Sequence, residues 1–228
     1  MWKEILSVFK GGGLTQEAFD EAMAMLEESR SMHHDAISAL HSPATLVADI
    51  YERDRRVNKY ERSVRRKVLT HLSVSSNPDI ATGLVLTAIV MDIERIGDYT
   101  KNIIELAQGL VEPFDGGELH QDFGELERML AEMFDKIIPA LEGPDVEGAR
   151  EIMETHKTVN RTVERDLELL RNNRVLQGQS GRAVTAALYL RYLKRVSAHL
   201  TNIASSVVNP YHRIGFKEKK KHRKERES

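Results

Sequence analysis

The sequence predicts an all-α protein made of two tandem three-helix bundles, with six long antiparallel helices. Three observations predict this fold. The 6 prolines and 14 glycines fall mostly in clusters, and the stretches between the clusters are rich in Ala, Leu, Glu, Arg and Met, which are good helix formers. Alternating runs of β-branched residues, which are typical of strands, do not occur in the sequence. Several residue pairs also recur at an offset of 100 or 102 positions.

The first predicted domain is a bundle over residues 14–111, preceded by a short lead-in. Residues 1–13 contain an amphipathic segment followed by the linker Gly11-Gly12-Gly13. The first long helix is predicted over residues 15–41, with Thr15 as its N-cap. The second is predicted over residues 43–74, with Pro43 in its first turn. The third is predicted over residues 78–110, with Asn77 as its N-cap.

The second predicted domain is a bundle over residues 118–209. Its helices are predicted over residues 118–141, 144–174 and 181–209, and Gly-Pro or Gly-rich segments separate them. All six helices are longer than the usual 11–12 residues or so. Long helices joined by short loops are typical of helical bundles. Residues 210–228 form a basic tail that is predicted to be disordered.

An internal repeat relates the two bundles. In the second helix of each bundle, Val57-Asn58 corresponds to Val159-Asn160 at an offset of 102. In the third helices the offset is 100, and the matched pairs are Arg95 with Arg195, Asn102 with Asn202 and Ile103 with Ile203. Loop lengths absorb a difference of two residues. The chain therefore reads as a duplicated unit of about 100 residues, which is an ordinary size for a domain.

Composition excludes several classes of protein. The chain has 228 residues, 41% of them hydrophobic and 30% charged, so it has enough apolar side chains for a core. It has no cysteine, which excludes disulfides, thiolate zinc sites and iron–sulfur clusters. A metal ion would have to be bound by oxygen or imidazole. The formal net charge of −2 argues against a nucleic-acid partner, although it leaves a local basic patch possible.

Charge is distributed unevenly along the chain. Residues 217–228 carry seven basic and three acidic side chains, a charge of +4, so the rest of the chain carries −6. This tail is either a solvated end or an arm for peripheral membrane contact, in which each basic residue contributes about 1 kcal/mol at an anionic surface. The longest nearly apolar run, residues 81–91, is far shorter than the roughly 20 residues of a membrane span. No signal peptide is visible, so a cytoplasmic location is predicted.

The most informative segment runs from residue 91 to residue 103. Glu94, Asp98 and Asn102 are spaced i, i+4, i+8, which places them in one row on a helix. Asp54, with Asn58 and Glu61, forms a similar row on the preceding helix. Oxygen ligands facing each other between antiparallel helices suit hard cations such as Mg²⁺, Mn²⁺ or iron. The alternative is an exposed acidic face paired with arginines. Gly97 lies inside this helix, which predicts close helix packing there.

These residues resemble a known family. Asp92-Ile93-Glu94-Arg95-Ile96-Gly97-Asp98, followed by Asn102-Ile103, is similar to the signature of the PhoU family of phosphate-signalling proteins. The resemblance extends over residues 14–209 and implies two tandem three-helix bundles. It implies no enzyme and no catalytic residues, but a cytoplasmic regulator that couples a phosphate transporter to a sensor histidine kinase and restrains phosphate uptake. It also implies a homodimer.

The resemblance further implies a divalent or trivalent metal ion, such as iron, zinc, magnesium or manganese. Its ligands would be Glu94 and Asp98 first, then Asp54 and Asn102. The second repeat departs from the family pattern, because Lys194 and Ala198 stand where the family has carboxylates and His156 corresponds to Asp54. The second metal site is therefore expected to be absent or replaced by an internal ion pair of Lys194. This departure suggests a relative that serves another transporter, such as a sodium- or proton-coupled carrier.

Two other classes of function stay open from the residues alone. One is a carboxylate-bridged metal enzyme or metal store, which the lack of a matching pair of Glu-x-x-His motifs disfavours for the ferritin-like type. The other is a membrane-associated helical interaction module that uses the basic tail. The adjacent His33 and His34 cannot both face one ion, because neighbouring helix residues point about 100° apart. The arginines of residues 53–66 suit either a solvated face or an acidic partner.

Overall fold

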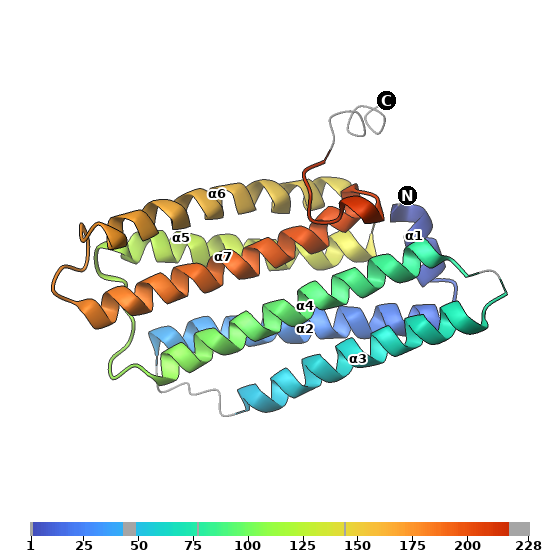
Figure 1. The fold of residues 1–228 in the computed structure, drawn as a ribbon, viewed down its shortest axis with the longest axis horizontal. Helices are drawn as coiled ribbons and strands as arrows, with labels where there is room; N and C mark the ends of the chain where they lie inside the picture. The colour runs from blue at the N-terminus through green and yellow to red at the C-terminus, as the bar shows by residue number, and fades with distance from the viewer. Residues whose placement is uncertain (1, 43–48, 77, 144, 219–228) are drawn as a thin grey trace.

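The computed structural model describes residues 2–42, 49–76, 78–143 and 145–218, and within these ranges the chain forms helices and no strand. The predicted all-α class is thus confirmed. Figure 1 shows the helices in chain order. Their bounds are α1 Trp2–Phe9, α2 Gly13–His41, α3 Ile50–Val74, α4 Ile80–Gln108, α5 His120–Glu142, α6 Val146–Arg171 and α7 Ser180–Val208, with short 3-10 turns at Gly117–Leu119 and Tyr211–Arg213.

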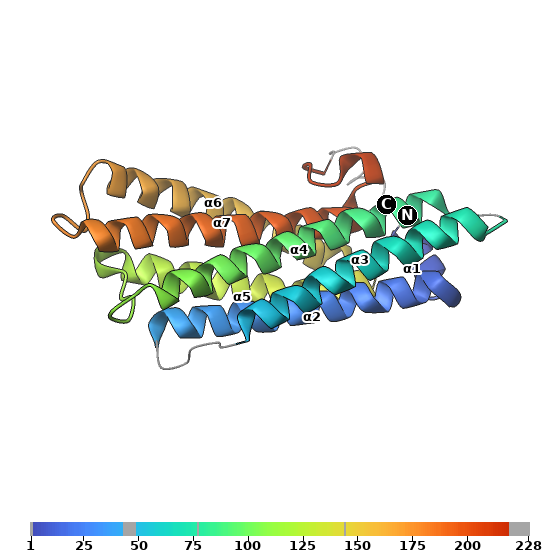
Figure 2. The same cartoon turned by 60° about the horizontal axis from the view of Figure 1, so that its bottom comes forward.

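The long helices form two three-helix bundles that lie side by side. Helices α2, α3 and α4 pack against one another, and so do α5, α6 and α7. The bundles meet along α4 and α7, with a smaller contact between α2 and α5. The molecule therefore has one layer in the order α3, α4, α7, α6 and a second layer made of α2 and α5 (Figures 1 and 2). Each bundle contributes two helices to the four-helix layer.

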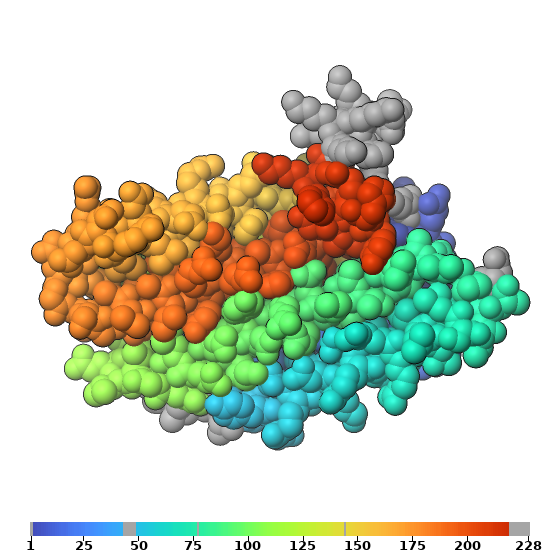
Figure 3. Space-filling model, viewed as in Figure 1, coloured from blue at the N-terminus to red at the C-terminus, as the bar shows by residue number. Residues whose placement is uncertain are grey.

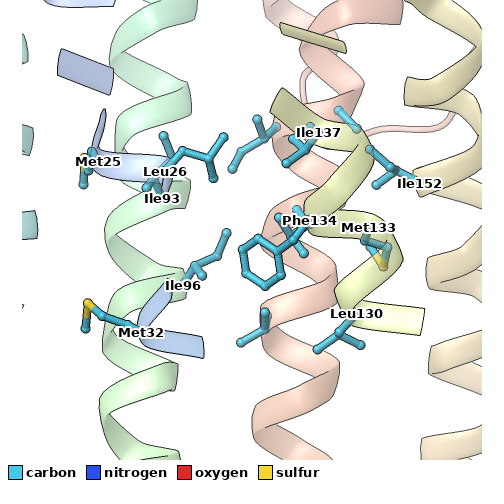
Figure 4. Close-up of a cluster of buried hydrophobic side chains, with 14 of the residues drawn as sticks. Met25, Leu26, Met32, Ile93, Ile96, Leu130, Met133, Phe134, Ile137 and Ile152 are labelled. Carbon is cyan, nitrogen blue, oxygen red and sulfur yellow. The ribbon is translucent and has the colours of Figure 1, made fainter. Parts of the chain in front are cut away.

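One hydrophobic core runs through both bundles. Helix α2 carries Met25, Leu26 and Met32 toward α4, and all three side chains are fully buried. Across the junction, Phe134 of α5 is buried against the same cluster, and Figure 4 shows side chains of both bundles meeting there. Because the apolar faces of the two bundles share this core, neither bundle ends in an exposed apolar surface at the junction.

Local capping differs from the predictions in several places. Helix α2 begins at Gly13, with Gly12 as the preceding residue at φ 90°, so Thr15 lies inside the helix and is not its N-cap. Helix α4 is capped by Asp79, whose carboxylate accepts the backbone N–H of Thr82 at 3.0 Å. The predictions for Asn77 and for the prolines at 43 and 144 lie outside the described residues. Asp145 caps α6 in the same way as Asp79 caps α4.

The lead-in helix α1 docks on the body of the protein. Its apolar residues Trp2, Ile5, Leu6 and Phe9 are all buried. The indole N–H of Trp2 donates to the carbonyl oxygen of Leu141 in the second bundle at 3.3 Å. The ring of Phe9 stacks on a phenylalanine of α2 at 4.7 Å between centroids. This segment is thus an integral part of the core.

The chain after α7 forms an ordered turn, which we call the C-terminal hook (residues 209–218). The side chain of Asn209 donates to the carbonyl oxygens of Arg213 and Phe216, and the N–H of Gly215 donates to Ser205 Oγ at 2.7 Å. Glu218 forms a two-pronged ion pair with Arg150 of α6 at 3.0 and 3.1 Å. The predicted disordered tail is therefore ordered over its first residues, while residues 219–228 lie outside the described ranges.

In the described part of the chain, no helix combines the length and the apolar character that crossing a bilayer requires.

Candidate functional site

The predicted carboxylates lie along the contact between α3 and α4. Asp54 and Glu61 come from α3, and Glu94 and Asp98 come from α4. The helices approach closely here because α4 has Gly97, where an added Cβ would lie 3.3 Å from Cγ1 of Val57. The predicted role of this glycine in close helix packing is confirmed. We call these four side chains the carboxylate cluster.

A lysine of α4 bridges two members of the cluster. The ammonium of Lys101 lies 3.1 Å from Oδ1 of Asp54 and 3.4 Å from Oδ1 of Asp98. The side-chain amide of Asn58 donates to the other oxygen of Asp54 at 3.3 Å. The guanidinium of Arg95 lies 3.2 Å from the second oxygen of Asp98. Asp54 and Asp98 therefore each have a cation of the chain itself beside them.

Glu94 is the least compensated member of the carboxylate cluster. Burial raises the pKa of its carboxyl, and the negative charges of Asp98, Glu61 and Asp54 raise it further. Its one opposing neighbour is Arg95, whose Nε lies 3.6 Å away. Three carboxylates thus act on Glu94 in the same direction, and an additional cation at this point would lower the electrostatic free energy.

The fourth predicted ligand, Asn102, has no polar contact with the other three within the described residues. Asn102 is half-buried on α4, and its side chain forms no hydrogen bond within the described ranges. More generally, no group of three or more His, Asp or Glu side chains in these ranges lies in an arrangement that would hold a metal ion. The donor atoms that hard cations prefer are present at Asp54, Glu94 and Asp98, but Lys101 lies between two of them. The residues can therefore bind a cation only if the ammonium of Lys101 moves away from Asp54 and Asp98.

The same place in the second bundle has a different chemistry. By the repeat offset, Lys194 corresponds to Glu94, and its ammonium pairs with Glu164 of α6. The expected internal ion pair of Lys194 is confirmed. His156 corresponds to Asp54 and hydrogen-bonds through Nδ1 to Ser197 Oγ at 2.9 Å. Burial, followed by the nearby Lys194, lowers the pKa of this histidine.

A cavity lies beside this second site. It has a volume of about 720 Å³, is open to solvent on one side, and is lined by α6, α7 and the C-terminal hook. Met153, His156, Ala198 and Phe216 contribute to its walls. Ala198 and Thr201 of α7 line it at positions where the first bundle has Asp98 and Lys101, and hook residues 215–218 form one wall. The first bundle therefore has the carboxylate cluster at this place, and the second bundle has a cavity that the hook partly covers.

Polar contacts join the two bundles next to the carboxylate cluster. Asp92 of α4 accepts hydrogen bonds from Nδ1 of His199 at 2.7 Å and from the side-chain amide of Asn202 at 2.9 Å. Nearby, Arg195 of α7 donates to the hydroxyl of Tyr99 at 3.0 Å. Sequence reasoning missed Asp92, although it lies in the signature segment and its neighbours 93 and 96 are fully buried.

The histidines at 33 and 34 point in different directions, as helical spacing predicts. His33 is buried against the ring of Phe134, with centroids 5.2 Å apart, and neither ring nitrogen has a partner within the described residues. Burial lowers its pKa to about 4, so the ring is neutral at physiological pH. His34 is exposed and lies beside Asp35. Neither belongs to the carboxylate cluster.

Comparisons with known proteins agree with one another. A family model described as "PhoU domain" matches the chain twice, at residues 22–107 and 123–207. The phosphate-specific transport system accessory protein PhoU homolog of Synechocystis sp. is 23% identical over 188 residues, covering 81% of this chain and 82% of that protein. The homolog of the same name from Deinococcus radiodurans is 28% identical over 184 residues, covering 74% of this chain and 80% of that protein.

A solved structure is similar as well. The crystal structure of PhoU from Pseudomonas aeruginosa superposes with a TM-score of 0.75 at 22% sequence identity, covering 86% of this chain and 95% of that chain. At this identity the likeness concerns the fold, namely the tandem helical bundles. The two matched copies of the domain coincide with the two bundles described above.

Proposed function

Because this chain belongs to the PhoU family, we propose that it is a cytoplasmic accessory regulator of phosphate transport and of the phosphate-starvation response. The observation that carries this proposal is the presence of two copies of the family domain, which together account for both bundles. Relatives that carry the name of a phosphate-specific transport accessory protein cover most of the chain. We expect the protein to act by binding partners and not by turning over a substrate.

A genetic experiment tests this function. Deleting the gene in its source organism should raise phosphate uptake in phosphate-replete medium and switch on starvation genes, and a wild-type copy should restore both. Labelled phosphate uptake and a starvation-promoter reporter are the measurements. If both stay at their wild-type levels in the deletion strain, the regulatory proposal is wrong.

The partners we propose are a phosphate transporter, a sensor histidine kinase or both, with the protein acting as a homodimer. The carrier can be a sodium- or proton-coupled one, since Lys194 and Ala198 replace the acidic pattern of the second repeat. Cross-linking followed by pulldown of the tagged full chain from native membranes should recover one of these proteins. Recovery of neither, together with turnover of a substrate by the purified protein, would favour the alternative of a metal-dependent enzyme.

We further propose that the carboxylate cluster binds a divalent or trivalent cation in competition with Lys101. Glu94, Asp98 and Asp54 would supply oxygen ligands, and Asn102 could join only through a change of its side-chain conformation. Support comes from Glu94, whose pKa is raised by burial and by three neighbouring carboxylates. A bound cation would neutralise this repulsion. It would also change the charge of the surface of the four-helix layer to which a partner would bind.

Two opposite substitutions test the cation site. Replacing the ligands in E94Q/D98N should abolish Mn²⁺ and Zn²⁺ binding measured by calorimetry on chelator-treated protein. Replacing the competitor in Lys101→Met should tighten binding on the order of tenfold, because an ammonium close to two carboxylates is removed. The matched control is Lys194→Met in the second bundle, which should leave binding unchanged. Equal binding by E94Q/D98N and wild type would refute the site.

A further inference from the structure

Helix α3 carries eight basic side chains, and they divide into two sets. Four of them form ion pairs that hold α3 to itself or to α2, namely Arg53, Arg56, Arg65 and Lys67. The other four are exposed and have no ion pair or hydrogen bond within residues 2–42, 49–76, 78–143 and 145–218. These are Arg55, Lys59, Arg62 and Arg66, which we call the basic stripe.

The basic stripe is a straight row. Its members are spaced i, i+4, i+7, i+11, which puts them on one face of the helix over a length of about 16 Å. Helix α3 is one of the two outer helices of the four-helix layer, and it runs along the lower edge of the molecule in Figures 1 and 3. Four uncompensated positive charges therefore point outward along this edge.

The row ends in exposed aliphatic side chains. Leu69 follows Arg66 by three residues on the same face and is 66% exposed. Val74, the last residue of α3, is 74% exposed, and Ile80, the first residue of α4, is 58% exposed. We call these three residues the apolar tip, and Figure 1 shows the end of the α3–α4 hairpin where it lies. Contact with water at this site is unfavourable for each of them.

The repeat provides an internal comparison. At the offset of 102, the stripe corresponds on α6 to Lys157, Arg161, Glu164 and Glu168. Two of these are basic and two are acidic. Lys157 pairs with Glu154, and Glu164 pairs with Lys194. At these corresponding positions α6 has no row of four unpaired basic side chains, so the stripe does not follow from the fold that the two repeats share.

We propose that the basic stripe and the apolar tip form a peripheral contact with an anionic membrane surface. The stripe would face acidic lipid headgroups, and the apolar tip would enter the headgroup region. A protein interface usually has an apolar centre surrounded by a polar rim, whereas here the charges and the aliphatic side chains follow one another along one edge of the molecule. Basic residues next to exposed aliphatic ones are the arrangement of interfacial membrane contacts.

This proposal stands apart from the regulatory function, because it requires neither a transporter nor a metal ion. It also differs from a contact through the basic tail. The hook, from which the tail continues, lies at the opposite long edge of the molecule from α3 (Figure 1). The two features can therefore be tested separately.

Vesicle binding tests the stripe. The full chain should co-sediment with vesicles of 70% phosphatidylcholine and 30% phosphatidylserine at low salt, and much less with pure phosphatidylcholine. The variant R55Q/K59Q/R62Q/R66Q should lower the partition coefficient at least about tenfold, since each basic residue near an anionic surface contributes roughly fivefold. The matched control R161Q/R171Q/R174Q/R191Q removes four exposed arginines of the second bundle and should bind within about twofold of wild type, because those arginines lie away from the α3 edge.

Further variants decide among the remaining outcomes. Removal of residues 219–228 should leave the effect of the stripe variant intact, and L69S/I80S should weaken binding to anionic vesicles without changing net charge. A stripe variant that binds anionic vesicles as well as the control overturns the proposal. So does equal weakening by the control variant, which would indicate net charge alone. If the stripe variant binds anionic vesicles normally but no longer binds an acidic protein partner, the stripe belongs to a protein interface. That result would also overturn the membrane proposal.

Discussion

His33 is an ionisable side chain whose buried ring is neutral at physiological pH. It is fully buried beside Phe134, both ring nitrogens lack partners within the described residues, and its pKa lies at about 4. In the unfolded chain an ordinary histidine has a pKa of about 6.5. As the pH falls below that value, the imidazole becomes protonated in the unfolded state but stays neutral in the folded state. The contribution of His33 to stability is thus complete above pH 6.5 and is lost toward pH 4.

We therefore predict that His33→Leu makes the protein less sensitive to acid. Between pH 7 and pH 4, the free energy of unfolding of the wild type should fall by roughly 3 kcal/mol more than that of the variant. Urea unfolding at several pH values measures this. A second variant, His33→Met, should show the same reduced pH dependence, because it also removes the buried imidazole. Parallel pH curves for wild type and His33→Leu would contradict the prediction.

The carboxylate cluster was predictable in its members but not in its charge balance. Helical spacing alone places Glu94 and Asp98 in one row, and the antiparallel neighbour brings Asp54 to them. Spacing could not reveal that Lys101 reaches across to Asp54, because this depends on the distance between α3 and α4 and on a long flexible side chain. Asn102 shares the row by sequence, but its side chain forms no hydrogen bond within the described residues.

At the scale of elements, the contact between α3 and α4 depends on Gly97. A Cβ at this position would lie 3.3 Å from Cγ1 of Val57, a buried β-branched side chain with little freedom to move. Glycine inside a helix costs about 1 kcal/mol relative to alanine. The close approach of the helices, and with it the geometry of the carboxylate cluster, offsets that cost.

Comparing two glycines isolates the packing effect. Gly124 lies inside α5, and an added Cβ would meet nothing within 4 Å. Gly124→Ala should therefore raise the free energy of unfolding by about 1 kcal/mol through helix propensity. Gly97→Ala should gain none of this, because the methyl group presses on Val57. Thermal and urea unfolding of both variants give the comparison. An equal gain in the free energy of unfolding in both would mean that a methyl group at position 97 fits between α3 and α4 without strain.

The helices themselves could be predicted well from the sequence, and their ends could not. Long uninterrupted stretches of helix formers gave all six long helices. The N-caps were less accessible, because Thr15, Asp79 and Asp145 are all suitable capping residues by type. In the structure Asp79 and Asp145 cap their helices, whereas Thr15 lies inside α2. The ordered hook includes the ion pair of Arg150 and Glu218, which are 68 residues apart and carry no local signal in the sequence.

At the scale of the whole molecule, the two bundles behave as one packing unit. They share a core around Phe134, and the polar contact of Asp92 with His199 and Asn202 crosses the junction next to it. The duplication was readable in the sequence, but the partner of Asp92 was not, since it requires knowing that α4 and α7 lie side by side. The two repeats also differ from each other at this scale: the first bundle has the carboxylate cluster, and the second has the cavity beside His156.

Removing the junction acceptor should weaken the entire molecule. Asp92→Ala leaves His199 and Asn202 without this carboxylate in a mostly buried position, so we expect a loss of about 1–3 kcal/mol in the free energy of unfolding. The transition should remain a single cooperative step in urea, because the shared core is intact. Asp20→Ala on the exposed side of α2 serves as the reference and should change stability by at most about 0.5 kcal/mol. A loss no greater than the reference would show that the junction relies on apolar contacts alone.

The docked lead-in helix has a practical consequence. Trp2 is the single tryptophan of the chain, and it is buried where α1 meets the end of α5, with its indole N–H on the carbonyl oxygen of Leu141. The protein thus contains a native fluorophore at one defined seam. A red shift of its emission would report release of the N-terminus from the second bundle, and it could be followed in real time while a membrane, a metal ion or a partner protein is added.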